Sequence, residues 1–147
     1  MRRILLGSDG SARARRAEDF AIAAAHADGG SVIALHVVDT DLMHYAKVDH
    51  LVTQDDKDSF MQYVKDQGEQ ECRIRLGGVV KKAREKGVEA RLHVRWGEPL
   101  REVLNAASES GADEIILPSQ SWGMDFNDSC LRARMNRSSR CKITILP

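Results

Sequence analysis

The chain has few cysteines and no excess of charge of either sign. Cys72, Cys130 and Cys141 make an odd number and no pair has CxxC spacing, so the sequence predicts neither a disulfide framework nor a cysteine zinc site. His44 and His50 are the histidines nearest to each other, but no third ligand has a matching spacing, and we expect no metal. Lys and Arg number 22, as do Asp and Glu, so we expect neither nucleic acid nor acidic lipid as a partner.

Long apolar runs are also missing. None approaches the roughly 20 residues that a membrane-spanning helix needs, so we expect no contact with a membrane. The basic and apolar start, residues 2–6, reaches Gly7 too soon for the apolar core of a signal peptide, which favours a cytoplasmic protein. Hydrophobic residues make up 42% of the chain, which is enough for a core, and the length of 147 residues predicts one domain, 1–147.

Short apolar runs bounded by turn residues predict the strands. The runs 4–6 and 115–117 do not alternate with polar residues, which is typical of strands buried on both faces of a sheet. Residues 88–96 alternate strictly, so this strand should lie half-exposed at a sheet edge. The expected strands cover residues 3–8, 31–38, 88–96, 115–117 and 142–146.

Helical spacing of apolar residues separates these strands. The first helix carries a stripe of alanines, and Asp9 or Ser11 is its predicted N-cap. The segment 40–54 has no pattern and predicts a long loop. The expected helices cover residues 11–28, 55–86, 99–110 and 127–136. Alternating strands and helices joined by right-handed crossovers predict an α/β domain, with one parallel sheet covered by helices on both faces.

Five stretches in order resemble the universal stress protein family over nearly the whole chain. They are Ile4-Leu5-Leu6-Gly7-Ser8-Asp9-Gly10-Ser11, His36-Val37-Val38-Asp39, Trp96-Gly97-Glu98-Pro99, Gly111-Ala112-Asp113-Glu114-Ile115-Ile116-Leu117 and Cys141-Lys142-Ile143-Thr144-Ile145-Leu146. The resemblance implies a Rossmann-like, adenine-nucleotide alpha-hydrolase-like fold of strand order 3-2-1-4-5, which agrees with the edge position expected for 88–96. It also implies a homodimer whose last strand pairs with its twofold copy through Ile143, Thr144, Ile145 and Leu146.

Family members that bind ATP carry G-x-x-G, nine further residues and G-[ST] after the fourth strand. Glycines there let backbone amides approach the phosphates. In this chain the first glycine position falls on Pro118, which has no amide hydrogen, and the second falls on Ser121. The final pair falls on Leu131-Arg132 or Ser129-Cys130, depending on the direction of counting. Each lost hydrogen bond to a charged group weakens binding by roughly 1.5–3 kcal/mol, so the chain resembles the branch that does not bind ATP.

Five residues are the candidate contacts should ATP or AMP bind: Asp9, Val38, Ser119, Ser121 and Ser129. The resemblance implies that Asp9 would contact the adenine or ribose and that Val38 would flank the adenine. The favoured alternatives are a helix cap for Asp9 and the end of a buried strand for Val38. The three serines could hold a phosphate through their hydroxyl groups, although serines are common in loops.

Bulky and basic residues follow the same strand. Trp122 and Phe126 are expected to fill the space that the glycines leave, with a partner-binding patch as the alternative. Basic residues gather over 132–142, where the default is a solvated helix face and the alternative is an anion site. Cys130 is expected to be a buried structural thiol, although a helix terminus and nearby arginines would favour a reactive one.

The leading hypothesis is a non-enzymatic, dimeric stress-response protein that needs no cofactor and acts through an unidentified protein partner. The alternative is a sensor of adenine nucleotides, ATP or AMP, whose phosphate site is rebuilt around Arg132 and Arg134. An enzyme is the third class. No base and nucleophile pair and no set of metal-binding carboxylates has an interpretable spacing, so we expect no catalytic residues.

Overall fold

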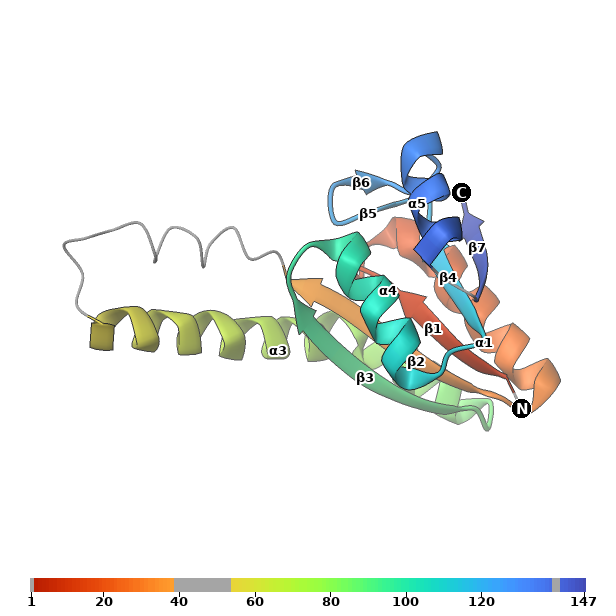
Figure 1. Ribbon diagram of the computed structural model, residues 1–147. Coiled ribbons are helices and arrows are strands. Elements are labelled where there is room, and N and C mark those ends of the chain that lie inside the picture. The colour runs from red at the N-terminus through yellow and green to blue at the C-terminus, as the bar shows by residue number, and fades with distance from the viewer. Residues whose placement is uncertain (1, 39–53, 139–140) are drawn as a thin grey trace.

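The computed structural model describes residues 2–38, 54–138 and 141–147. The strands of its main sheet are β1 (Arg3–Gly7), β2 (Ser31–Val38), β3 (Glu89–Trp96), β4 (Glu114–Pro118) and β7 (Lys142–Leu146). They are parallel neighbours in the order β3-β2-β1-β4-β7 (Figure 1). Because β7 is the fifth strand of this sheet, the predicted order 3-2-1-4-5 is confirmed, and so is the edge position of residues 88–96.

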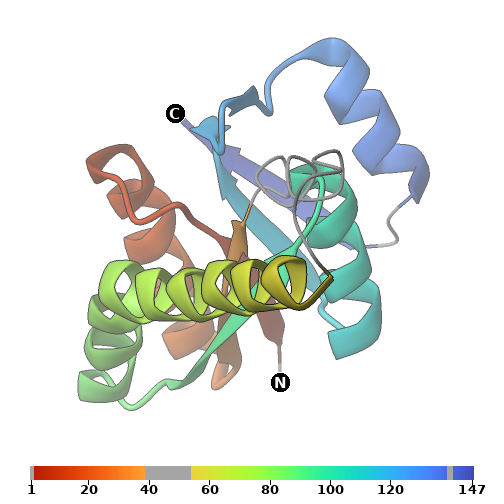
Figure 2. The same ribbon diagram turned by 90° about the vertical axis from the view of Figure 1, so that its left-hand side faces the viewer.

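Two clusters of buried side chains, one on each face of the sheet, hold the layers together. The helices are η1 (Ala12–Ala14), α1 (Arg15–Asp28), α3 (Gln54–Glu85), α4 (Pro99–Ser110) and α5 (Ser129–Ser138). α1 and α3 cover one face, and α4 and α5 cover the other (Figures 1 and 2). Ile4 and Leu6 of β1 belong to the first cluster and Leu5 to the second. A strand that feeds two cores needs apolar residues at consecutive positions, which explains its unbroken run.

The long helix α3 passes through Gly77 and Gly78 without a break. It buries the predicted stripe at Cys72, Leu76 and Val79. Its first half extends beyond the carboxyl ends of β2 and β3 (Figure 1). The predicted loop over 40–54 lies outside the described residues except for Gln54, and so do the side chains of Phe60 and Val64. Within the described part of the chain, no helix combines the length and apolar character needed to cross a membrane.

Two connecting segments differ in part from the expectations. Ser11 is the N-cap residue of η1, but it makes no capping bond through its side chain, and Asp9 Oδ1 accepts a hydrogen bond from the Ser11 amide at 2.9 Å. The segment after β4, expected to be irregular, forms a hairpin of β5 (Gln120–Ser121) and β6 (Met124–Asp125).

Glu18 gives the fold a measurable pH dependence. This residue of α1 has a buried side chain, which accepts a hydrogen bond from Ser8 Oγ at 3.1 Å. Burial raises the pKa of Glu18, and the hydrogen bond from Ser8 and the charge of Lys82 offset this only in part. The folded protein therefore favours the protonated form. Its contribution to stability is full at low pH and is lost as the pH rises through the folded-state pKa.

We therefore expect Glu18→Gln to raise the melting temperature by about 2–4 °C at pH 8 and by much less at pH 4. Thermal unfolding followed by circular dichroism at both pH values measures the difference. Asp19→Asn removes an exposed carboxylate of the same helix and should give no such rise. A rise of equal size at both pH values would contradict the assignment.

Candidate functional site

The strand order reverses direction between β1 and β4, which lie side by side in the middle of the sheet. The chain continues from β1 to β2 and β3 on one side, and from β4 to β7 on the other. In parallel sheets ligands bind outside the carboxyl ends of the strands at such a point. The segments that leave β1 and β4 therefore form the candidate site, and they contain Asp9, Ser119 and Ser121.

Several backbone groups around the hairpin after β4 are already engaged in hydrogen bonds within the protein. Its turn residues, Trp122 and Gly123, both have positive φ, 52° and 73°, as a tight two-residue hairpin turn requires. The amide of Ser119 donates to the carbonyl of Leu146 at 2.7 Å, and the amide of Phe126 donates to the carbonyl of Ser119 at 2.8 Å. The amide of Ser119 is therefore bonded to the neighbouring strand β7.

The turn places the indole of Trp122 over the end of β1. Its Cη2 lies 3.0 Å from the position that a Cβ atom would take on Gly7. Its Nε1–H donates to Nδ1 of His36 at 3.4 Å, and its ring meets Phe126 edge-on with 6.3 Å between the centroids. Phe126 is fully buried and Trp122 half-buried. Both aromatic residues pack against the protein itself, in agreement with the prediction that they fill space.

Polar side chains from three elements surround this contact. Burial lowers the pKa of His36, and the charge of Arg75 acts in the same direction, while those of Glu71 and Asp9 oppose it. The neutral ring leaves a lone pair on Nδ1 for the indole N–H of Trp122. Arg75 also donates from Nη1 to the carbonyl of Asp9 at 2.8 Å and pairs with Glu71 at 2.7 Å. The crevice beside β1 and β2 is thus lined by groups that bond to one another.

Asp9 holds the loop and the hairpin together. Burial acts to raise the pKa of its carboxyl group, but hydrogen bonds from Ser11 and from the backbone amide of Trp122 outweigh this, so the pKa lies below its ordinary value. The carboxylate therefore stays charged near neutral pH, and it accepts a hydrogen bond from within the protein. Asp9 and Trp122 are far apart in the chain, so no local sequence pattern could predict that they lie close together.

A pocket of about 500 Å³ lies between the loop after β1 and the hairpin. The structure brings two predicted contacts, Asp9 and Ser121, to its wall, together with Arg13 and Gln120. Arg13 Nη1 donates to Gln120 Oε1 at 2.6 Å. Ser121 is 3% exposed, and its Oγ has no hydrogen-bond partner among the described residues. Polar and apolar groups both line the pocket, and within the described residues Arg13 supplies its positive charge.

The other predicted contacts lie apart from this pocket. Val38 packs at the end of β2, where its Cγ2 lies 2.8 Å from the position that a Cβ atom would take on Gly68 of α3. Its carbonyl accepts a hydrogen bond from the amide of Gly97 at 3.1 Å. The amide of Ser119 donates a hydrogen bond to Leu146 of β7. Ser129 is the exposed first residue of α5. Of the five predicted contacts, Asp9 and Ser121 line this pocket, whereas Val38, Ser119 and Ser129 do not.

Two carboxylates stand at the beginning of α5, and the sequence analysis missed both. Asp128 Oδ1 accepts from the amide of Cys130 at 3.4 Å, and Asp125 Oδ1 accepts from the amide of Asn127 at 2.9 Å. Acidic groups at a helix N-terminus occupy the place that an anion would take. The signal was available, because an aspartate directly before a helix is typical of an N-cap. It also explains why α5 begins at Ser129 rather than at the expected position 127.

The basic residues of α5 do not gather at the pocket. Arg134 pairs with Glu98 at 3.2 Å, while Arg132 and Arg137 are exposed and Arg140 lies outside the described residues. Cys130 is exposed, so the expectation of a buried thiol is wrong, because the first turn of α5 faces solvent. In the described part of the chain, no group of three histidine, cysteine or acidic side chains is placed to hold a metal ion.

Comparison with known proteins identifies the family. The model of the universal stress protein family matches residues 1–125. The chain belongs to the universal stress protein family. A comparison with curated proteins finds no match for this universal stress protein.

Solved structures show the same fold. The protein MJ0577, solved as a test case of structural genomics, is 19% identical with a TM-score of 0.75, over 99% of this chain and 94% of that one. A universal stress protein from Archaeoglobus fulgidus in complex with dAMP is 17% identical with a TM-score of 0.65, over 100% and 98%. Another, in complex with cAMP, is 16% identical with a TM-score of 0.64, over 99% and 96%. At these identities the likeness establishes the fold.

The burial of the two aromatic residues predicts different effects of their removal. Phe126→Ala empties a fully buried site, so we expect the free energy of unfolding to fall by about 3–5 kcal/mol. Trp122→Ala removes a half-buried lid, and we expect a fall of about 1–2 kcal/mol. Urea unfolding curves of both variants provide the comparison. An equal or larger loss for Trp122→Ala would mean that Trp122 belongs to the core.

Proposed function

We propose that this universal stress protein is a non-enzymatic, dimeric stress-response protein of the cytoplasm that acts through protein contacts and holds no ATP. The hairpin after β4 carries the proposal. Just before it, the last residue of β4, Pro118, has no amide hydrogen, and the amide of Ser119 is bonded to the carbonyl of Leu146. Backbone donors that a phosphate would need are therefore missing or engaged.

Charge at this end of the sheet supports the same conclusion. A triphosphate bound at the start of α5 would meet the carboxylates of Asp125 and Asp128, which already accept hydrogen bonds from the local amides. It would also have to displace the indole of Trp122 from Gly7. Each charge-assisted hydrogen bond that is not formed weakens binding by roughly 1.5–3 kcal/mol, and two or three such losses turn a micromolar site into a negligible one.

The second candidate function is a sensor of adenine nucleotides. Structures of relatives in complex with cAMP and with dAMP favour it, as does the pocket beside Asp9. Its rebuilt phosphate site would use Arg13, because Arg13 lines the pocket whereas Arg134 is paired with Glu98. A guanidinium group offers planar paired donors that suit a phosphate.

Isothermal titration with ATP and with AMP, each with magnesium, separates the two functions. The proposal expects no saturable binding at concentrations below about 1 mM, a free energy weaker than roughly 4 kcal/mol. Low-micromolar binding that is lost in Arg13→Ala but kept in the matched variant Arg132→Ala would establish the sensor instead. Product analysis after incubation with ATP tests for hydrolysis in the same samples.

The dimer is proposed to form through β7. This strand lies at the edge of the sheet, and Ile143, Thr144, Ile145 and Leu146 are only half-buried there. An edge strand with apolar side chains on both faces is suited to pairing with a second copy.

We expect Ile145→Lys to abolish this pairing, because it places a charge at a half-buried apolar position that a second copy would cover further. Light scattering should show half the mass of any assembly that depends on β7, whereas the control Lys142→Ala at the start of the strand should leave the mass unchanged. An unchanged mass for Ile145→Lys would rule out β7 as the interface.

A further inference from the structure

The face of α3 that points away from the sheet carries a stripe of uncharged residues. It consists of Tyr63, Gln67, Gln70, Ile74 and Gly77, alternately four and three residues apart. At 100° per residue these positions lie opposite the buried Cys72, Leu76 and Val79. Tyr63 is 60% exposed and Ile74 is 75% exposed, and they are two of the three large hydrophobic residues exposed in the described part of the chain. The alternating spacing is that of a helix seam packed against another helix.

Two consecutive glycines, Gly77 and Gly78, lie at the end of this uncharged stripe. A Cβ atom added to Gly77 or Gly78 would meet nothing within 4 Å, so no contact in the described fold requires glycine at either position. Glycine inside a helix costs about 0.5–1 kcal/mol relative to alanine. The pair leaves a notch on the helix surface, and a notch of this kind admits a bulky side chain from an approaching helix.

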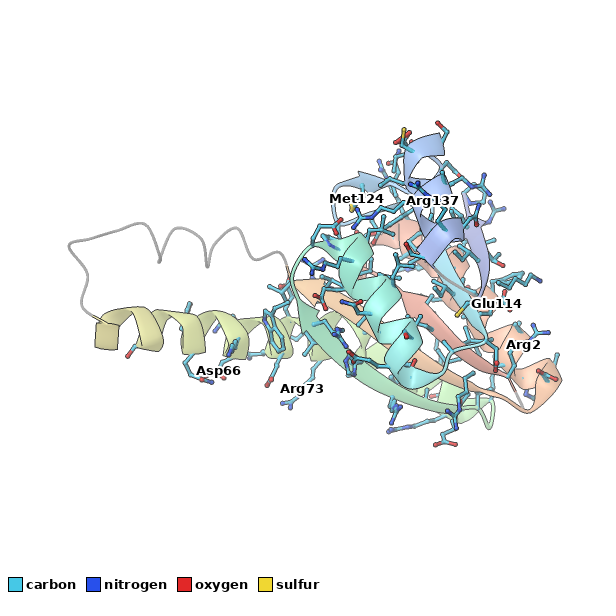
Figure 3. All side chains as sticks on the ribbon, viewed as in Figure 1. Arg2, Asp66, Arg73, Glu114, Met124 and Arg137 are labelled. Carbon is cyan, nitrogen blue, oxygen red and sulfur yellow. The ribbon has the colours of Figure 1, made fainter. Side chains whose placement is uncertain are left out.

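Charged residues on one flank of the stripe are self-complementary. Asp66 and Arg73 project from the same side of α3 (Figure 3). Asp66 accepts a hydrogen bond from Gln62 at 2.9 Å, and Arg73 makes no ion pair with any described residue. Seven residues separate them, which is about 10 Å along the axis, so they do not meet within one helix. Two antiparallel copies of the helix would bring Asp66 of each beside Arg73 of the other.

We propose that two copies of this chain associate through α3, antiparallel, about a twofold axis near Gln70. In this register Tyr63 of each copy enters the notch at Gly77 and Gly78 of the other. Asp66 lies beside the partner's Arg73, and the arrangement repeats across the axis as an isologous interface requires. The interface is separate from β7 and does not rest on the proposed function. Where both form, the assembly contains more than two chains.

A charge exchange tests the proposal in the full-length chain. Analytical ultracentrifugation of Asp66→Arg and of Arg73→Asp should each show association through α3 weakened by roughly tenfold, because each variant places like charges together twice. The double variant Asp66→Arg with Arg73→Asp should recover the association of the unmodified chain. No contact within one helix can produce this recovery. Glu69→Arg, a control on the same helix but away from the stripe, should have no effect.

The same series in an Ile145→Lys background isolates α3 from β7. There the proposal predicts a dimer that falls apart on Asp66→Arg and returns in the charge-exchanged double variant. A monomer in this background would overturn the inference and leave the proposal for β7 standing. A dimer that neither single variant weakens would overturn the inference as well. A dimer of the unmodified chain that Ile145→Lys abolishes, but that Asp66→Arg and Arg73→Asp do not weaken, would also overturn the inference.

Crosslinking provides a second readout that does not depend on affinity. Gln70→Cys, made together with Cys130→Ser to remove the exposed native thiol, places one thiol beside the twofold axis. Mild oxidation should give a disulfide-linked dimer on a non-reducing gel, whereas Glu69→Cys in the same background should remain monomeric on that gel. No crosslink at position 70, or equal crosslinking at both positions, would contradict the antiparallel register.

Discussion

The contact between the indole of Trp122 and Gly7 determines what the carboxyl end of this sheet can hold. A Cβ atom on residue 7 would clash with Leu117 Cδ2 and lie 3.0 Å from Trp122 Cη2, so glycine leaves room for both side chains. The ring reaches this place because Trp122 and Gly123 both adopt positive φ in a two-residue turn. Asp9 lies beside the turn in the opposite loop, where the nearby backbone amide of Trp122 helps to lower the pKa of its carboxyl group. One tight hairpin thus joins the segments that follow β1 and β4, and a ligand in the crevice would have to displace it.

The two edges of the sheet differ in chemistry, and this difference directs how the molecule meets others. On β3, Arg95 pairs with Glu102 at 2.7 Å and with Glu109 at 2.6 Å, and these hydrogen bonds raise the pKa of Arg95. Charged side chains along an edge discourage pairing with another strand. On β7 the residues are largely apolar and half-buried. The uncharged stripe on the outer face of α3 is a second surface of this kind. Neither proposed contact therefore uses the edge of the sheet at β3.

Much of the fold could be predicted from the sequence, because burial leaves direct marks on it. Unbroken apolar runs at 4–6 and 115–117 reported strands covered on both faces, and alternation over 88–96 reported an edge. The site was less predictable, because its decisive contacts are long-range. Asp9 and Trp122 line one pocket and Trp122 bonds to His36, and neither pair is close in the chain. Gly123 takes no position of the glycine motif, and its structural role is the turn that it forms with Trp122.

The contents of the crevice in protein purified from cells test the central claim most directly. A crystal structure determined without added ligand, combined with mass spectrometry of small molecules released on denaturation, would provide them. We predict that the indole of Trp122 lies over Gly7 and that no nucleotide is released. Electron density for a nucleoside with its phosphates beside Ser119, and Trp122 turned away from Gly7, would contradict the account.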